Sequence, residues 1–148
     1  MEEGDLPVPA MNERRPKVYP CLAYRDPAAA ITFLQRAFGF SPMLTVPGED
    51  GVIMHAELAF GDEVVMLGGA KQELGWVSPL DLPALNATVC FFVEDVDAHF
   101  ERAVQAGAMV VRALRDTNYG SREYSVKDPE GQEWHFGTYR PTPDGADA

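Results

Sequence analysis

The sequence predicts an α+β domain made of two tandem βαβββ units, and three observations support this fold class. A β-prone run that leads directly into an amphipathic helix occurs twice within the 148 residues. Three more short β-prone runs follow each helix. A constant offset of 69 residues places Cys21 on Cys90 and Asp26 on Asp95, as expected when a strand-helix element has been duplicated.

The first unit is expected over residues 17–69. It opens with the β-prone run 17–24, after which Asp26 is a helix N-cap and Pro27 occupies the first helical position. Apolar residues then recur at steps of three and four until Gly39, and this spacing predicts one amphipathic helix. The strands that follow are predicted over 43–47, 52–60 and 63–68.

The second unit is expected over residues 87–140 and repeats the same order. A strand over 87–93 precedes Asp95, and the second helical stripe ends at Gly107. The remaining strands are predicted over 108–114, 121–126 and 132–138, with a turn at 128–131. Between the units lies a linker rich in Pro and Leu over 70–86, and flexible ends are expected over 1–16 and 141–148.

Composition and charge exclude several classes of protein. The formal net charge of −11 disfavours binding to nucleic acid or to anionic lipid and mildly favours a cationic small ligand. No apolar run approaches the roughly 20 residues that cross a bilayer, and the N-terminus lacks the basic and apolar stretches of a signal peptide. The two cysteines have no CxxC spacing, so we expect a cytoplasmic protein with reduced thiols and without nucleic-acid or membrane partners.

Strand alternation separates two faces of each predicted sheet, because successive residues of a strand point to opposite sides. In the run 52–60, the apolar residues fall on a face that packs under a helix, which leaves His55 and Glu57 on the opposite face. In the last strand, Glu133 and His135 alternate in the same way with large aromatic residues. Such a face either lines a ligand cleft or is a solvated outer surface.

Three stretches of sequence carry a resemblance to a known family: the helix text AAAITFLQRAFGF, the segment VEDVDAHFERAVQAGA and, above all, the run YGSREYSVKDPEGQEWHFGTY. Together with the paired units, they resemble the vicinal-oxygen-chelate superfamily of glyoxalase, bleomycin-resistance and extradiol dioxygenase proteins over residues 17–140. The resemblance implies curved, partly closed mixed sheets around a cleft, formed within one chain or between the chains of a dimer.

The resemblance also implies where metal ligands lie in the metal-using members, namely on the first and the last strand of each unit. These positions fall on Tyr19, Thr88, His135 and Val65, or on Met66 if the register shifts by one residue. Only His135 is a good first-row metal ligand, whereas a catalytic site needs about three protein ligands. We therefore expect no metal cofactor, and a homodimer that binds a small organic molecule as the metal-free members do.

The side chains expected to face the ligand lie on the open sheet faces or in the segment around Gly120. They are Tyr19, Cys21, His55, Glu57, Val65, Thr88, Cys90, Phe92, Tyr119, Arg122 and His135. Cys21 and Cys90 are interpreted as buried small hydrophobes, with a redox pair as the alternative. Tyr119 and Arg122 either contact the ligand or pack as ordinary strand residues, and His99 is expected to be solvated on the second helix.

Two other functions stay open. As an enzyme, the chain would be a glyoxalase-like lyase or isomerase with a divalent metal on His55, Glu57 and His135. Glu133 or Glu123 would complete that ligand set. A metal-free acid–base catalyst built on His135 is the second form of this hypothesis, whereas the same histidine without a catalytic role would be a hydrogen-bonded residue of the cleft. The third possibility is an interaction module whose cleft is filled.

Overall fold

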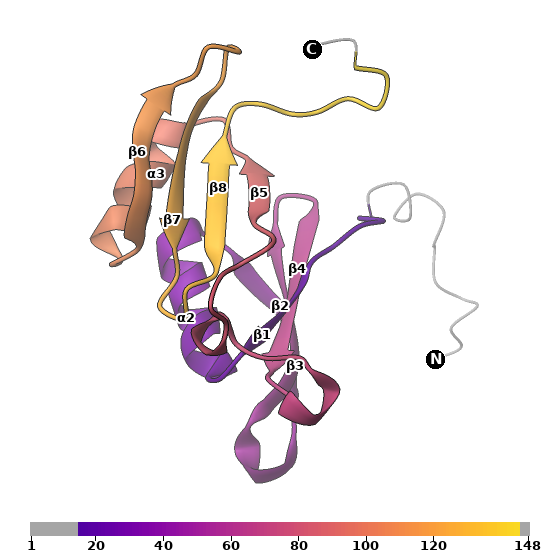
Figure 1. Cartoon of the computed structure of the whole chain (residues 1–148). Helices are drawn as coiled ribbons and strands as arrows, with labels where there is room; N and C mark the ends of the chain where they lie inside the picture. Colours follow the sequence, from indigo (N-terminus) through magenta and orange to yellow (C-terminus); the bar gives the residue numbers. More distant parts are fainter. Residues whose placement is uncertain (1–14, 146–148) are drawn as a thin grey trace, which may run out of the picture.

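The computed structural model describes residues 15–145, which fold into two βαβββ units with two four-stranded sheets (Figure 1). Most of the expected leader and the end of the expected tail, residues 1–14 and 146–148, lie outside the described residues. The first unit contains β1 (Cys21–Tyr24), α2 (Pro27–Phe38), β2 (Ser41–Pro47), β3 (Ile53–Phe60) and β4 (Glu63–Gly69). The second contains β5 (Val89–Phe92), α3 (Val96–Gln105), β6 (Met109–Asp116), β7 (Arg122–Lys127) and β8 (Glu133–Gly137). The predicted α+β fold class is confirmed.

Both helices begin where the capping residues predict. The Asp26 carboxylate accepts a hydrogen bond from the Ala29 amide at 3.1 Å, and the Asp95 carboxylate accepts one from the Ala98 amide at 3.1 Å. These bonds satisfy amides that have no partner within the helix. Gly39 ends α2 with φ of 80°, a conformation that glycine adopts without steric cost.

The two sheets have the same topology, with strand order β1-β4-β3-β2 in sheet 1 and β5-β8-β7-β6 in sheet 2. In each sheet the first strand runs parallel to the last strand of its unit. Cys21 is in register with Met66, and Cys90 is in register with His135. The offset of 69 residues therefore persists in three dimensions and relates one pair to the other.

Both sheets bury their helix-bearing faces in one shared core. Phe38 of α2 joins the units, because its ring centroid lies 5.5 Å from that of Trp134 and 4.7 Å from that of Phe136, both on β8. Since the two covered faces meet in this core, the other face of each sheet is open. No helix within residues 15–145 is long and apolar enough to cross a membrane.

The turn at 128–131 locks the second unit onto the first. The Asp128 carboxylate accepts hydrogen bonds from the Tyr24 hydroxyl at 2.6 Å and from the Trp134 indole N–H at 3.1 Å. The Glu130 carboxylate accepts bonds from the backbone amides of Arg25 at 2.7 Å and Asp26 at 2.9 Å. The DPEG motif is thus a structural junction between the end of β1 and the start of β8.

His99 forms a second junction, and its expected solvation is wrong. Its Nε2–H donates to the Phe38 carbonyl at 2.9 Å, so the neutral ring accepts the Tyr124 hydroxyl proton at Nδ1 over 2.5 Å. Burial lowers the pKa of His99, because desolvation disfavours the charged imidazolium. The helical pattern put this residue on a polar side, but that side of α3 faces the other unit.

Candidate functional site

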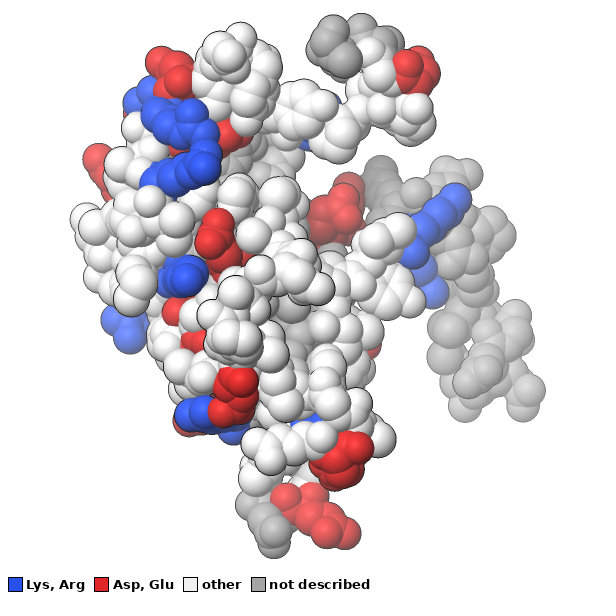
Figure 2. All heavy atoms as spheres, viewed as in Figure 1, with Lys and Arg blue, Asp and Glu red and all other residues white. Residues whose placement is uncertain are grey.

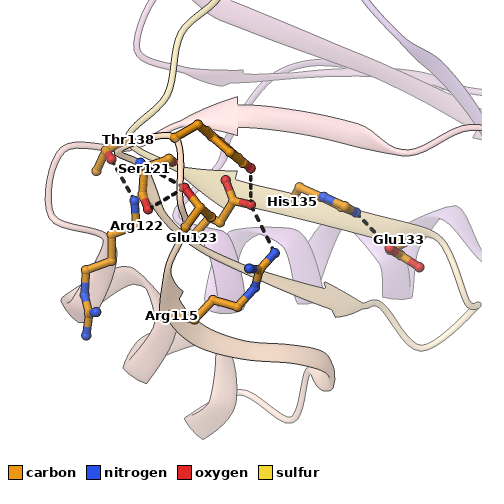
Figure 3. A network of polar contacts seen from close by, with 9 residues as sticks. Arg115, Ser121, Arg122, Glu123, Glu133, His135 and Thr138 are labelled. Atoms are coloured by element: carbon orange, nitrogen blue, oxygen red, sulfur yellow. Dashed lines mark hydrogen bonds and ion pairs between the residues drawn. The ribbon is translucent and has the colours of Figure 1, made fainter.

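The open face of sheet 2 carries a polar cluster that β8 positions by alternation. Trp134 and Phe136 are 0% and 1% exposed in the core, which turns Glu133 and His135 to the opposite face. His135 Nε2 lies 2.8 Å from Glu133 Oε2 (Figure 3). Because a carboxylate only accepts, the bond places the imidazole proton on Nε2 and leaves Nδ1 as the basic nitrogen.

One end of the same face is shaped by Gly137, which lies in register with Phe92 on β5 and with Glu123 on β7. A Cβ atom at Gly137 would lie 2.7 Å from the Glu123 Cβ, so the glycine is needed for these strands to approach. The Tyr119 hydroxyl donates to the Glu123 carboxylate at 2.6 Å, and this bond raises the pKa of Tyr119. Arg115 ion-pairs with the same carboxylate at 3.5 Å (Figure 3).

A groove of about 920 Å³ runs along the free edge of β5, between that strand and the turn that joins β3 to β4. Apolar and aromatic side chains line it, including Phe60 and Phe92, and Cys90 opens onto it. The Arg140 guanidinium carbon lies 4.5 Å from the centre of the Phe92 ring, a distance typical of a cation–π contact. In Figure 2, acidic side chains are visible beside the end of the β3–β4 hairpin, in the hollow between the two terminal segments.

The open face of sheet 1 holds a different set of side chains. His55 Nε2 lies 2.9 Å from Glu57 Oε2, and Cys21 and Met66 are the neighbours in register on β1 and β4. The linker approaches this sheet where β4 ends, since the Trp76 ring lies 3.7 Å from the position of a Cβ on Gly68. Each sheet therefore presents one His–Glu pair on its open face.

Several expected positions are corrected by the register of the strands. Val65, expected on the open face, is 1% exposed in the core, and Met66 takes its place beside Cys21. Tyr19 and Thr88 precede β1 and β5, so the residues in register with the last strands are two residues later. A one-residue uncertainty in strand register, which exchanges the two faces, explains the error at Val65, whereas the shift from Tyr19 and Thr88 is two residues along the strand and keeps the same face.

Arg122 is also placed differently from the expectation. It belongs to the set of β7 residues that face α3, and its guanidinium contacts Asp97 at 2.9 Å and Asp116 at 3.1 Å. Hydrogen bonds to these carboxylates raise the pKa of Arg122. In Figure 3 its side chain points away from Glu123 and His135, so it is not available to a ligand on the open face.

Both cysteines are free and exposed, which corrects their interpretation as buried residues. Among residues 15–145 there is no group of three or more His, Cys, Asp or Glu side chains that could hold a metal ion. The relocated set of His55, Glu57 and His135 is therefore not assembled within the described part of one chain. The residues now at the inherited positions are divided between the sheets, with Cys21 and Met66 on sheet 1 and Cys90 and His135 on sheet 2.

The alternation of β8 correctly predicted that Glu133 and His135 share one face. The sequence did not predict the contacts of two arginines near this face, Arg115 and Arg140. Arg115 lies on β6, whose register shifts twice against β7, and simple alternation does not predict its partner. Arg140 follows the last strand and lies in a segment without periodicity. Neither arginine lies in a periodic pattern that would have predicted its contact.

Known proteins share both the sequence pattern and the fold of this chain. The model of the Glyoxalase/Bleomycin resistance protein/Dioxygenase superfamily matches residues 18–136. This chain belongs to that superfamily. An uncharacterised protein of Mycobacterium bovis is 41% identical over 125 residues, which cover 82% of each protein.

Solved structures of the superfamily agree with the fold. TioX from Micromonospora sp. ML1 is 35% identical with a TM-score of 0.68, and the match covers 83% of this chain and 98% of TioX. The fosfomycin resistance protein FosX from Listeria monocytogenes, a complex with Mn(II) and sulfate, is 12% identical with a TM-score of 0.64 over 84% of this chain and 90% of FosX. The latter similarity concerns the fold alone.

Proposed function

We propose that this protein is a cytoplasmic, metal-independent binder of a small organic molecule, which lies against the open face of sheet 2. The proposal rests on the polar side chains of that face and on the groove at its edge. Cys90 lines a groove of about 920 Å³ and lies in register with His135, which is hydrogen-bonded to Glu133 on the same face. The volume is in the range of small-ligand sites, which span about 300–1,000 Å³. A few polar groups among aromatic walls are the usual composition of such sites.

A second copy of the chain is proposed to complete the site. The shared core uses the helix-bearing faces of both sheets, so within one chain the two open faces have no cover. Exposed apolar side chains also follow the edge strands β2 and β6, namely Met43, Leu44, Met109, Val110 and Val111. Exposed apolar edge strands favour association with another chain. We propose a homodimer in which sheet 1 of one copy faces sheet 2 of the other.

Metal independence is tested by isothermal titration of the full chain with Mn²⁺ and Zn²⁺. No tight stoichiometric site is expected, because residues 15–145 contain no group of three or more His, Cys, Asp or Glu side chains that could hold a metal ion. A site with micromolar or tighter affinity would overturn this part of the proposal. Light scattering after size exclusion tests the dimer, and a monomer at all concentrations would contradict it.

Ligand binding is tested by thermal shift with bleomycin and a panel of aromatic organic cations and neutral aromatics. A binder should raise the melting temperature of the wild type and lose this effect in His135→Ala. Glu101→Ala, on the exposed side of α3, is the matched control and should keep the effect. A panel without any binder, or an equal shift in both variants, would count against this location.

The second candidate function is a metal-free acid–base enzyme. The 2.8 Å bond between His135 and Glu133 favours it, because a carboxylate that orients the imidazole leaves the other ring nitrogen free to accept a proton. Loss of turnover in both His135→Ala and Glu133→Gln, with the fold intact by circular dichroism, would support it. Turnover that survives His135→Ala would exclude it.

A further inference from the structure

Cys90 and His135 are lateral neighbours on the open face of sheet 2. They are in register on the parallel strands β5 and β8, whose backbones lie about 4.8 Å apart, and residues in register point to the same side of a sheet. Glu133 holds Nε2 of the imidazole at 2.8 Å. The basic Nδ1 nitrogen is therefore the one left to accept the thiol proton.

The thiol is also accessible and has a further hydrogen-bonding neighbour. Cys90 is exposed on a strand with a free edge, and it lines the groove of about 920 Å³ together with the aromatic residue Phe92. The Thr88 hydroxyl oxygen lies 4.0 Å from the Cys90 sulfur, within reach to donate to a thiolate. The nucleophile thus lines a space that a small molecule can enter, while the base and its orienting carboxylate lie on the neighbouring strand.

The duplication supplies a control within the same chain. Cys21 is the equivalent residue of the first unit, since it lies at the matching position of β1. Its neighbour in register is Met66, whose thioether does not accept a proton from a thiol at neutral pH. Burial raises the pKa of Cys21, which further lowers its thiolate fraction.

We propose that Cys90 is a nucleophile that captures electrophilic small molecules, such as α,β-unsaturated carbonyl compounds, with His135 as its base. The proposal rests on the proposed function, because it names the ligand class of the same open face. The thiol proton moves to His135 Nδ1 while the sulfur bonds to the β-carbon and the double-bond electrons shift toward the carbonyl. The resulting enolate takes this proton back at the α-carbon, so the product is a thioether and no atom is lost.

The charges that face Cys90 have opposing effects on its thiolate. Protonated His135 on β8 and Arg140 after β8 favour the anion, whereas Glu133 and the acidic residues of the groove oppose it. Those acidic residues are Asp62 and Glu63 in the β3–β4 turn and Glu94 and Asp95 after β5. His135 is the cation in register with the thiol, so the difference between Cys90 and Cys21 should depend on this imidazole.

The test is alkylation of the full-length wild type with N-ethylmaleimide, with the rate at each cysteine read by peptide mass spectrometry across a range of pH. Near pH 7, Cys90 is expected to react about three- to tenfold faster than Cys21, because His135 can accept the thiol proton of Cys90 and Met66 cannot accept that of Cys21. In His135→Gln the rate at Cys90 should fall to about that of Cys21, and Glu133→Gln should give an intermediate rate.

Equal rates at the two cysteines would overturn the proposal. So would a His135→Gln variant, folded by circular dichroism, whose Cys90 reacts at the wild-type rate, or a Cys90 that resists alkylation. If the reversible ligand shift of the wild type is present while the cysteines react alike, only the nucleophile is refuted. If no ligand shifts the melting temperature either, the proposed function fails as well.

Discussion

Asp128 should be among the most sensitive positions of the chain, because one carboxylate satisfies four donors at the junction of the units. It accepts bonds from the Tyr24 hydroxyl, the Trp134 indole and the backbone amides of Glu130 and Gln132, at 2.6 to 3.1 Å. Tyr24 and Trp134 are 1% and 0% exposed, so water cannot replace the lost acceptor. Since each buried donor left without a partner costs about 1–3 kcal/mol, Asp128→Ala is expected to lower the free energy of unfolding by about 4 kcal/mol.

Urea denaturation of matched alanine variants measures this effect. Asp26→Ala is the control, because that carboxylate accepts one bond at an exposed helix start and its loss should cost about 1 kcal/mol. If Asp128→Ala costs no more than the control, the turn at 128–131 does not lock the units together and the reasoning is refuted.

The same residue has a pH signature. Burial raises the pKa of Asp128, against the opposing effect of its hydrogen bonds. The raised pKa therefore adds a pH-dependent increment of stability, which is fully present below the unfolded pKa of about 3.9 and is lost as the pH rises through the folded pKa, whereas the hydrogen bonds that the carboxylate accepts remain. The stability difference between wild type and the uncharged Asp128→Asn variant should shrink as the pH rises through this window, and a difference that grows would contradict the sign.

Three further outcomes are expected. Burial lowers the pKa of His99. The stability that the neutral ring contributes is therefore present above the unfolded pKa of about 6.5 and is lost as the pH falls through the folded pKa. The denaturation midpoint of the wild type should fall with pH in this window, and that of His99→Gln should change less. Gly137→Ala should destabilise the fold by about 1–3 kcal/mol, because the new Cβ would lie 2.7 Å from that of Glu123. Gly69→Ala, where the nearest atoms lie at 3.6 Å or more, should be near neutral by the same thermal unfolding assay. Arg102→Met should cost about 1–2 kcal/mol, since the guanidinium donates to two carbonyls in the last turn of α2 at 2.9 Å, and a change below the error of the urea measurement would exclude that role.

The elements of the fold could be predicted from local chemistry. Asp26 and Asp95 cap the two helices, and the alternation of apolar and polar residues defines β3 and β8. Such signals involve residues that are close in sequence, so a single amino-acid sequence is sufficient to detect them. The constant offset of 69 residues then linked the two copies, and no structural knowledge was needed to expect equivalent strands.

The register of a strand against its neighbour depends on contacts distant in sequence, and there the predictions were weaker. Val65 and Met66 are both apolar, so composition does not tell which one enters the core; the pairing with β1 decides it. Arg122 follows a turn without periodicity, and its direction is set by Asp97 on α3. His99 was misplaced for the same reason, because a polar position on a helix becomes an interior one when a second helix packs over it.

The duplicated units also differ in a way that explains where chemistry is concentrated. The offset relates Cys21 to Cys90 and Met66 to His135, so a thiol is retained in both units, while an imidazole in register with it occurs in the second unit alone. The Met66 thioether contributes apolar contact surface but no proton acceptor, and the imidazole of sheet 1, His55, pairs with Glu57. If sheet 1 of one copy covers sheet 2 of another, the reactive thiol belongs to sheet 2. Met66→His should raise the alkylation rate of Cys21, and His135→Met should lower that of Cys90. Alkylation rates that are unchanged in both variants would show that the residue in register with each cysteine does not control its reactivity.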